Sequence, residues 1–580
     1  MSDTVALTIN GISVTVSSDA TILDAAYAAG VKVPTLCYLK GVNEIGACRM
    51  CLVEIEGARG LQAACVSPVA DGMVVKTNTP ALRESRKGTL ELILSNHRTD
   101  CLSCSRSTEC ELQSLCNEYA VDMDEFGRSN LAPDIDDSAV HLVRDNSKCI
   151  LCRRCVAVCS KNQHVAVIGV NNRGYDTHIS SAFEMQLSET SCVHCGQCIS
   201  ICPTGALIER DDSAKVWEAL DDPTKHVVVA PAPSVRAQLG ESFGLPIGTN
   251  VEGKLAAALR RLGFDSVFDV DTAADLTIME EGAELLHRIQ EGGRFPMITS
   301  CSPGWIKFCE YYFPEFIPNL SSCKSPQQMF GAMTKTYYAE KIGKDPKEIF
   351  VVSIMPCTAK KFEITRDHQS ASGAPDIDVS LTTRELAGMI KRAGIIFDRL
   401  PDEKFDPIFG VASGAGHIFG ATGGVMEAAL RTVAEVATGK RPDSIDFMAV
   451  RGVEAIKEAE YDLDGTKVRV AVTSGLENAY QLLTMVKNGE KDYHFIEIMA
   501  CPGGCVNGGG QPIQSSYVRN TIDLRAERAK ALYGADSAMA LRTSHENPVI
   551  KEIYEDFLEK PGSHKSHELL HTQYTKRDIY

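Results

Sequence analysis

The sequence of 580 residues predicts a multidomain protein in which small cysteine-rich α+β domains precede one large α/β domain. Sixteen of the 22 cysteines lie before residue 203, so the two parts differ in composition. Later in the chain, β-branched runs such as KHVVVAPAP and IFVVSIMPC alternate with helical segments such as GKLAAALRRLGF and TTRELAGMIKRAG. This alternation is typical of α/β folds with buried strands. We expect four domains, at residues 1–80, 81–125, 126–212 and 213–580.

Charge and hydropathy exclude several classes of protein. A net charge of −17 argues against nucleic acid as a partner. No stretch approaches about 20 uninterrupted apolar residues, so we expect no membrane span. The N-terminus, MSDTVALTINGISVTV, lacks the basic region and long apolar run of a secretion signal. Abundant cysteine without such a signal indicates reduced thiols, and we expect a cytoplasmic protein.

The first domain combines a hairpin, a helix and four cysteines. TVALTINGISVTV alternates apolar and polar residues around Asn10-Gly11, which predicts a β-hairpin. In SSDATILDAAYAAG, Ser18 or Asp19 is expected to cap a helix that Gly30 ends. A zinc site is one interpretation of the cysteines, but the C-x10-C-x2-C-x13-C spacing and the preceding elements favour a plant-type [2Fe–2S] ferredoxin-like domain. The four candidate ligands are Cys37, Cys48, Cys51 and Cys65.

A second set of candidate ligands contains one histidine. The helical stretch ALRESRKGTLELILSNH leads into the spacing H-x3-C-x2-C-x5-C. On spacing alone, a Cys3His zinc site is an equally good interpretation. The position of the set favours a [4Fe–4S] cluster, because a redox-inert metal between redox centres would interrupt electron transfer. The candidate ligands are His97, Cys101, Cys104 and Cys110.

The most specific pattern is a doubled C-x2-C-x2-C-x3-C motif, present as CILCRRCVAVC and CVHCGQCISICP. Paired runs of this type bind two [4Fe–4S] clusters, because the fourth cysteine of each run reaches across to the other cluster. Structural zinc and disulfides are the alternatives, but zinc needs four ligands in one group. The first expected set is Cys149, Cys152, Cys155 and Cys202, and the second is Cys192, Cys195, Cys198 and Cys159.

Two acidic segments, VDMDEFGRSNLAPDIDDSAV and DDSAKVWEALDDPTK, are interpreted as connectors on either side of this doubled motif. The chain up to residue 212 is thus interpreted as ferredoxin-like iron–sulfur domains, followed by a large α/β catalytic domain. In that domain, four of six cysteines lie in turns rich in glycine or proline, where small neighbours let the backbone approach a bulky inorganic ligand. These are Cys301 in TSCSPGW, Cys357 in MPCTAKKFE, and Cys501 and Cys505 in MACPGGCVNGGGQP.

These segments resemble the signature motifs of [FeFe] hydrogenases, and MPCxxKxxE and ExMACxxGCxxGGGxP are the specific ones. The whole chain resembles the monomeric clostridial type with four accessory clusters. The resemblance implies reversible H2 oxidation and proton reduction at an H-cluster, a [4Fe–4S] cluster linked to a diiron unit with CO, cyanide and azadithiolate. It also implies one [2Fe–2S] and three accessory [4Fe–4S] clusters. Ferredoxin or a similar small carrier and maturation proteins are the implied partners.

The resemblance also assigns roles to individual residues. Cys357 and Cys501 resemble cubane ligands, Cys505 the bridging thiolate, and Lys360 the lysine that donates to a cyanide. The residues that resemble other parts of the diiron pocket are Pro233, Ser234, Gln327, Met355, Phe419, Gly420 and Met499. The proton pathway that ends at Cys301 is matched by Glu281, Ser321, Glu284 and Arg288. On spacing alone, the three charged residues could equally form a solvated ion-pair face of a helix.

One position departs from the family. The usual segment has two adjacent cysteines, of which the first passes the proton and the second is the remaining cubane ligand, whereas here Cys301 is followed by Ser302. A serine alkoxide is a hard ligand for an iron–sulfur corner. Ser302 could complete the cubane, Cys301 could do so and leave the proton step, or water could occupy that corner.

Two other classes of protein remain as alternatives. The large iron–sulfur subunit of NADH dehydrogenases looks similar over residues 1–210 but lacks the later hydrogenase motifs. Because of Ser302, an H2-sensing or low-turnover hydrogenase-like protein stays open, although no signalling domain is evident. Cytosolic cluster-assembly relatives lack a full relay and the diiron unit.

Overall fold

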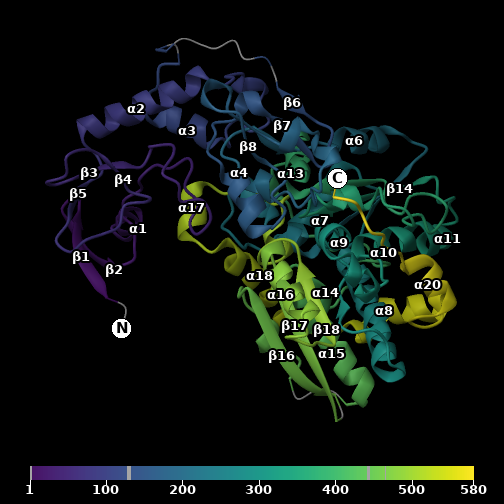
Figure 1. The fold of residues 1–580 in the computed structure, drawn as a ribbon. Helices are drawn as coiled ribbons and strands as arrows, with labels where there is room; N and C mark the ends of the chain where they lie inside the picture. The colour runs from purple at the N-terminus through teal and green to yellow at the C-terminus, as the bar shows by residue number, and fades with distance from the viewer. Residues whose placement is uncertain are drawn as a thin grey trace.

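The computed structural model describes residues 3–123, 125–126, 132, 134–440, 444–463 and 465–579. In Figure 1 a small N-terminal domain (purple) projects from a large body that holds the remaining elements. Among the described residues, no helix has both the length and the apolar character needed to cross a membrane.

The N-terminal domain is built on a five-stranded sheet with the order β2-β1-β5-β3-β4. The hairpin prediction is confirmed, since Asn10 and Gly11 have φ angles of 51° and 86° between the first two strands. The predicted helix cap is wrong: Thr21 caps α1 (Ile22–Ala28) because its side chain forms a capping box with Asp24. The strands are β1 (Thr4–Ile9), β2 (Ile12–Ser17), β3 (Leu52–Ile55), β4 (Gln62–Ala63) and β5 (Val74–Lys76).

Four helices and two small sheets carry the next three sets of candidate ligands. α4 and α5 each follow one C-x2-C segment, and both have a left-handed residue at the N-cap, namely Arg153 and Gly196. The doubled motif therefore folds twice in the same local way. The elements are α2 (Pro80–Ser95), α3 (Glu111–Glu118), β6 (Ile135–Asp136), β7 (Leu142–Asp145), α4 (Arg154–Ala157), β8 (Gly169–Asn171), β9 (His178–Ser180), α5 (Gln197–Ser200) and β10 (Leu207–Glu209).

The two predicted connectors differ from expectation. Part of the first falls on residues 124, 127–131 and 133, outside the described residues, and β6 within it pairs with β7. The second contains a helix, α6 (Ser213–Asp221), so its reading as a break is wrong. Its apolar side, Val216 and Ala219, packs into the largest core cluster, while Lys361 bonds to Asp212 at 2.7 Å. Long-range packing therefore overrides the acidic composition.

The large domain contains two four-stranded sheets, with the orders β12-β11-β14-β15 and β13-β18-β17-β16. Every pairing is parallel except that of β16 with β17. Buried valine and isoleucine runs form the strands, as expected for parallel sheets covered on both faces. The α/β prediction is confirmed. The strands are β11 (His226–Pro231), β12 (Ser266–Val267), β13 (Met297–Ile298), β14 (Ile349–Met355), β15 (Val379–Thr382), β16 (Ile456–Leu463), β17 (Thr466–Ser474) and β18 (Phe495–Met499).

Helices surround both sheets; α8 packs against α10 and α15, and α15 also contacts the second sheet (Figure 1). The predicted helices GKLAAALRRLGF and TTRELAGMIKRAG are α7 and α13. The helices are α7 (Glu252–Leu262), α8 (Val270–Glu291), α9 (Pro303–Tyr312), α10 (Pro326–Met333), α11 (Ala339–Ile342), α12 (Lys360–Glu363), α13 (Thr383–Arg392), α14 (Gly414–Ile418), α15 (Gly424–Thr438), α16 (Leu476–Lys487), α17 (Ser516–Thr521), α18 (Leu524–Ala538), α19 (Pro548–Ile553) and α20 (His564–Leu570).

Helix α17 joins the N-terminal domains to the large domain. The ring of Tyr517 lies edge-on to Tyr27 at 5.3 Å, and the Asn520 side chain accepts the backbone N–H of Lys40 at 3.2 Å. Ser516 bonds to the side chains of both Glu111 and Arg154. In Figure 1 this helix lies between the purple domain and the rest of the body.

Candidate metal centres and active site

Four of the predicted site segments begin where a parallel strand ends. Ser234 and Cys357 follow β11 and β14 in one sheet, whereas Cys301 and Cys501 follow β13 and β18 in the other. Carboxyl ends of parallel strands meet at one edge of a sheet, where α/β folds bind their ligands. The topology thus brings both halves of the candidate active site together.

The cysteines predicted to hold the H-cluster lie close together; Cys501 is buried, and Cys357 and Cys505 are half-buried. Burial raises the pKa of Cys357, Cys501 and Cys505, and the charge of Cys357 raises it further for the other two. Cys505 reaches a pKa of about 12. Buried thiolates of this kind are stabilised by a compensating cation, and soft sulfur donors suit iron–sulfur clusters. The donor set therefore fits the cluster that the motifs imply.

The GGG run at residues 508–510 brings three site segments into direct contact. A side chain at Gly508 would place its Cβ 2.2 Å from the carbonyl oxygen of Pro356. At Gly509, a Cβ would lie 2.4 Å from the carbonyl oxygen of Cys195. Only glycine fits at such distances, so this run serves close packing of cluster-binding loops.

Lys360 is held by a buried polar network beside Cys301. Its ammonium donates to the Cys301 carbonyl at 3.1 Å, to Ser325 Oγ at 2.7 Å and to Glu363 Oε2 at 2.8 Å. The same carboxylate oxygen accepts from Gln327 Nε2 at 2.9 Å. Sequence reasoning gave no role to Glu363 or Ser325, although the glutamate closes the MPCxxKxxE motif. The network orients two of the predicted pocket residues.

Cys301 and Ser302 point toward different neighbours. Cys301 packs in one apolar cluster with Phe419, Met499 and Cys505. Burial raises its pKa well above the ordinary value, and Glu281 and Cys505 raise it further. Ser302 Oγ instead accepts the backbone N–H of Ala500 at 3.2 Å, immediately before Cys501. Ser302 thus lies on the side of the predicted cubane ligands, and Cys301 lies on the side of the predicted bridging thiolate.

The residues of the predicted proton pathway lie beside one another, three of them on α8 and Ser321 next to that helix. Arg288 donates to Glu284 Oε1 at 2.5 Å, and Ser321 Oγ donates to Glu284 Oε2 at 3.0 Å. Glu281 bonds to the Ser321 side chain, and burial followed by the charge of Glu284 raises its pKa to about 8. Burial thus prepares Glu281 to hold a proton near neutral pH.

The predicted walls of the diiron pocket also converge. A Cβ at Gly420 would lie 3.1 Å from the Ser234 Cβ, so the segment after α14 touches the turn after β11. Gln511, which sequence reasoning missed, donates to Ser234 Oγ at 3.1 Å and to the Cys505 carbonyl at 3.2 Å. The remaining predicted wall residues, all buried, are Pro233, Met355, Phe419 and Met499.

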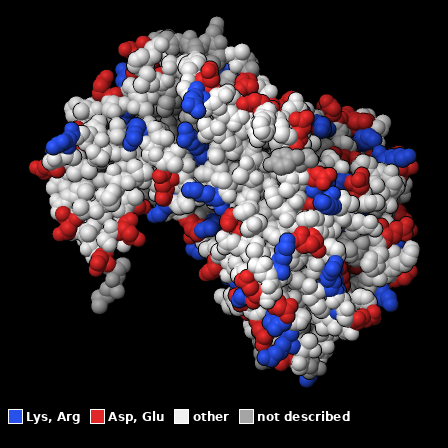
Figure 2. All heavy atoms as spheres, viewed as in Figure 1, with Lys and Arg blue, Asp and Glu red and all other residues white. Residues whose placement is uncertain are grey.

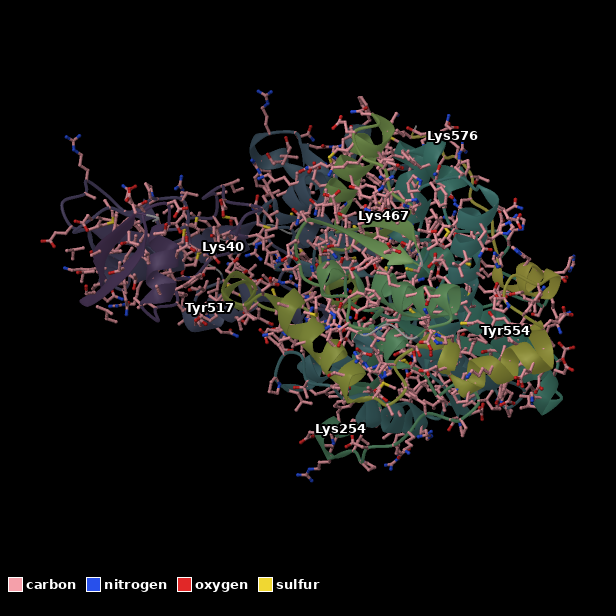
Figure 3. The ribbon with its side chains drawn as sticks, turned by 90° about the horizontal axis from the view of Figure 1, so that it is seen from below. Lys40, Lys254, Lys467, Tyr517, Tyr554 and Lys576 are labelled. Atoms are coloured by element: carbon pink, nitrogen blue, oxygen red, sulfur yellow. The ribbon has the colours of Figure 1, made fainter. Side chains whose placement is uncertain are left out.

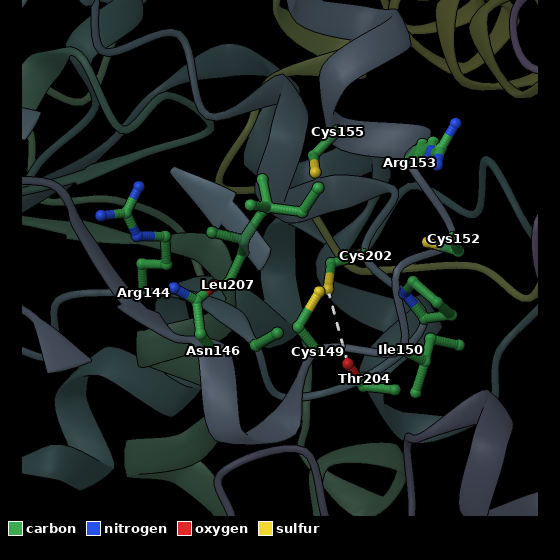
Figure 4. A pocket seen from close by; sticks show the side chains of 13 residues that line it. Arg144, Asn146, Cys149, Ile150, Cys152, Arg153, Cys155, Cys202, Thr204 and Leu207 are labelled. Atoms are coloured by element: carbon green, nitrogen blue, oxygen red, sulfur yellow. Dashed lines mark hydrogen bonds between the residues drawn. The ribbon is translucent and has the colours of Figure 1, made fainter. Parts of the chain in front are cut away.

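The doubled motif forms two pockets, and each pocket is lined by one of the two predicted sets. Figure 4 shows the sulfur atoms of the first set around one pocket, with Thr204 bonded to Cys202. Each pocket combines cysteines from both halves of the motif, as the interlocked ligand pattern requires. The first pocket contains Cys149, Cys152, Cys155 and Cys202, and the second contains Cys159, Cys192, Cys195 and Cys198.

His97 has the properties of a neutral ligand. Burial, followed by the charge of Lys148, lowers its pKa to about 4, so the imidazole is neutral at pH 7. Its Nδ1 is buried and has no hydrogen-bond partner among the described residues. Burial raises the pKa of both Cys101 and Cys110, and the charge of the nearby Cys104 contributes to the rise. A buried, neutral imidazole with an unpaired nitrogen fits the histidine of the predicted mixed ligand set.

We expect His97→Cys to retain the cluster at this site but to lower its reduction potential, because a thiolate adds negative charge. Electron paramagnetic resonance during a redox titration measures that potential. Cys116→Ser is the control, because Cys116 lies nearby and is not a predicted ligand. Tightly bound zinc in place of iron would contradict the assignment.

Contacts between the sets indicate a route for electrons. Asn43 donates to the Cys37 carbonyl at 2.8 Å and to the Cys152 carbonyl at 3.0 Å, which joins the first domain to the first pocket. Cys51 and Cys65 of that domain have their sulfur atoms 3.3 Å apart. At the other end, Cys195 is close enough to raise the pKa of Cys501.

The His97 set adjoins the first pocket from another side. A Cβ at Gly205 would lie 2.7 Å from Cys104 Sγ. Cys110 Sγ lies 3.6 Å from the carbonyl oxygen of Pro203, the residue after Cys202. The first pocket therefore has two of the predicted cluster sites as neighbours.

Family models match along the chain. The model for the iron-only hydrogenase large subunit, C-terminal domain, matches residues 225–509, and that for the iron hydrogenase small subunit matches residues 522–577. A 2Fe-2S iron–sulfur cluster binding domain matches residues 2–80, and a 4Fe-4S dicluster domain matches residues 148–206. Between them, the NADH-ubiquinone oxidoreductase-G iron–sulfur binding region matches residues 86–124.

Full-length relatives decide the family. The chain is 45% identical to Iron hydrogenase 1 of Clostridium pasteurianum, over 98% of this chain and 99% of that protein. It is 48% identical to the NADP-reducing hydrogenase subunit HndD of Solidesulfovibrio fructosivorans, over 98% of this chain and 99% of that protein. The chain belongs to the [FeFe] hydrogenase family.

Solved structures agree with this membership. Apo [FeFe]-hydrogenase HydA1 of Chlamydomonas reinhardtii superposes with a TM-score of 0.57 at 44% identity, over 63% of this chain and 98% of that chain. The 580-residue chain is thus a hydrogenase that catalyses the reversible conversion of H2 into protons and electrons. In addition to its catalytic domain, it has [2Fe–2S] and [4Fe–4S] domains. Ferredoxin-like domains followed by a large α/β catalytic domain are therefore its architecture.

Proposed function

We propose that this hydrogenase holds its H-cluster with Cys357, Cys501, Cys505 and Ser302, and that Cys301 delivers protons to it. The observation that carries this proposal is the divergence of two adjacent side chains. Ser302 Oγ accepts the backbone N–H of Ala500, the residue before Cys501. Cys301 instead packs in one apolar cluster with Cys505, and burial, followed by the charge of Glu281, raises its pKa. Adjacent side chains can thus serve two sides of one cofactor.

When bound, the diiron unit supplies the two-electron chemistry on hydrogen. The chain supplies protons through Arg288, Glu284, Ser321 and Glu281, in that order from the surface. A carboxyl with a pKa of about 8 gives up and regains a proton near neutral pH with little driving force in either direction. This suits a reversible reaction. Lys360 fixes the backbone of Cys301 through its carbonyl.

We further propose one [2Fe–2S] and three accessory [4Fe–4S] clusters, which pass electrons between a small carrier such as ferredoxin and the H-cluster. The 22 cysteines are all free of disulfides, which suits a reducing cytoplasm. On the face in Figure 2, acidic and basic side chains are interspersed. A carrier that docks there would therefore pair its charges with individual side chains, because this face has no large patch of a single charge. Maturation proteins would insert the diiron unit.

Two alternatives concern the setting of this chemistry. The relative named as an NADP-reducing hydrogenase subunit favours a larger assembly in place of a monomer. Ser302 favours low turnover, as in an H2-sensing protein, if the fourth cubane corner is weakly held.

We expect the fully matured protein to bind about 20 iron atoms and to evolve H2 from reduced methyl viologen. Infrared bands of CO and cyanide should appear only after maturation. Protein produced without maturation proteins is the control and should lack only the diiron unit. Iron-replete, matured protein without those bands would contradict the proposal, and bands without H2 evolution would favour the sensing alternative.

A further inference from the structure

A segment near the end of the chain lies beside the outer end of the proton pathway. Thr572 N donates to the Ser322 carbonyl at 2.8 Å, and Lys324 N donates to the Leu570 carbonyl at 2.8 Å. These two bonds form an antiparallel bridge between residues 570–572 and 322–324. In Figure 1, α20 (yellow) lies next to α10 and α8. Backbone pairing thus fixes residue 571 opposite the pathway.

The side chain of His571 reaches the pathway through one hydroxyl group. Its Nδ1 lies 2.8 Å from Ser322 Oγ. Glu284 Oε2 in turn accepts from the Ser322 backbone N–H at 3.1 Å and from Ser322 Oγ at 3.4 Å. Glu284 therefore has a hydrogen-bonded connection to an imidazole in addition to its bond with Arg288.

The same imidazole lines a surface pocket, with 7% of its side chain exposed. Ser322, His567 and His571 line an open surface pocket of about 520 Å³, together with Lys324 and His368. The ring centroids of His567 and His571 lie 4.0 Å apart. His567 is exposed, so water in the pocket can exchange protons with this pair.

We propose that His571 and Ser322 form a second proton entrance to Glu284, separate from Arg288. A proton leaves Nδ1 of the protonated imidazole for Ser322 Oγ, while the hydroxyl proton of Ser322 moves to Glu284 Oε2. The imidazole is left neutral and takes its next proton from water or His567 in the pocket. The proposal rests on the proposed function, because it extends the same pathway.

The observed contacts give little support to a purely structural role for the His571 side chain. Its Nε2 lies 3.3 Å from Glu280 Oε2, but that carboxylate also accepts from Tyr554 Oη at 2.5 Å and Gly562 N at 2.9 Å. Figure 3 places Tyr554 on the side of the molecule that holds the C-terminal helices. The backbone bridge is independent of the side chain. Charged and titratable groups around His571 are Glu280 and Glu284 on α8, His567 and Glu568 on α20, and Lys324 and His368 in the pocket.

The test compares His571→Asn with wild-type holoenzyme in H2 evolution from reduced methyl viologen across the pH range. Asparagine keeps a polar group near the Nδ1 position but cannot titrate. We expect a loss of about threefold or more, smaller than the ~10²-fold loss of an essential proton donor, because the Arg288 entrance remains. Added imidazole should restore the rate. The control is His564→Asn, at an exposed histidine of the preceding helix α20, and it should leave the rate unchanged.

A second variant separates proton transfer from local packing. Ser322→Ala should lose as much activity as His571→Asn, and the double variant should lose no more than either, because both residues act in one path. Iron content and infrared bands should match wild type throughout. An unchanged rate in His571→Asn, or a loss that imidazole does not restore, would overturn the proposal. Failure of the wild type itself to show bands or activity would overturn the proposed function instead.

Discussion

Replacing Cys301 by alanine is expected to abolish nearly all turnover, by about 10²-fold or more, while iron content and the infrared bands of CO and cyanide are retained. The reason is the position of Cys301 between the Glu281 end of the pathway and Cys505. Without its thiol, protons need another donor within hydrogen-bond reach. H2 evolution from reduced viologen measures the loss, and infrared spectra of the same sample measure cofactor retention.

Ser302→Cys is the matched variant at the neighbouring position. It should add a fourth thiolate beside Cys501 and make the cubane harder to remove with a chelator, with activity kept or raised. The opposite pattern would contradict the assignment. If Cys301→Ala bleaches the iron–sulfur absorption of the cubane and Ser302→Cys changes nothing, then Cys301 is the ligand.

The second large effect is expected for Glu281→Gln, which should slow turnover by about 10²-fold or more and change the pH dependence of stability. The folded-state pKa of Glu281 is about 8, against an ordinary value of 4.5, because of burial and the nearby charge of Glu284. Between these values the folded state holds a proton that the unfolded state releases. Stability from this group is therefore fully present below pH 4.5 and is lost as the pH rises to about 8.

Glutamine does not titrate, so the variant should lack this loss, which is at most about 5 kcal/mol in the free energy of unfolding. Apparent unfolding temperatures of the matured proteins, compared between pH about 5 and about 8, measure the difference. Glu291→Gln is the control because Glu291 is exposed at the end of the same helix. A wild-type turnover rate, or the same alkaline destabilisation as wild type, would show that Glu281 does not carry the proton.

Patterns of short range predicted most of the local structure. The Asn10-Gly11 hairpin and the two helices α7 and α13 depend on neighbouring residues, and the sequence displays these directly. The doubled cysteine motif predicted which four cysteines lie around each pocket, because the ligand spacing of a cluster is a local constraint. The wrong prediction of the helix cap also concerned neighbouring residues. Thr21 and Asp24 form a capping box, whereas Ser18 and Asp19 do not.

Contacts between distant segments were beyond the sequence patterns. Composition alone made residues 211–225 a connector, whereas burial against the first sheet makes part of it a helix. Gln511 was missed because its partners, Ser234 and Cys505, come together only in the folded chain. The alternatives for Ser302 stayed open for the same reason, since its bond to Ala500 spans 198 positions.

Helix α17 has a consequence for the order of events during synthesis. Its bond between Asn520 and Lys40 joins positions 480 residues apart. At the usual pace of translation, the ribosome needs roughly 25 to 100 seconds to cover that length. The ferredoxin-like domains of each nascent chain thus emerge and can fold well before α17 exists to dock them. Their cysteines are accessible to cellular iron–sulfur donors throughout that interval, on domains that still tumble independently of the catalytic one.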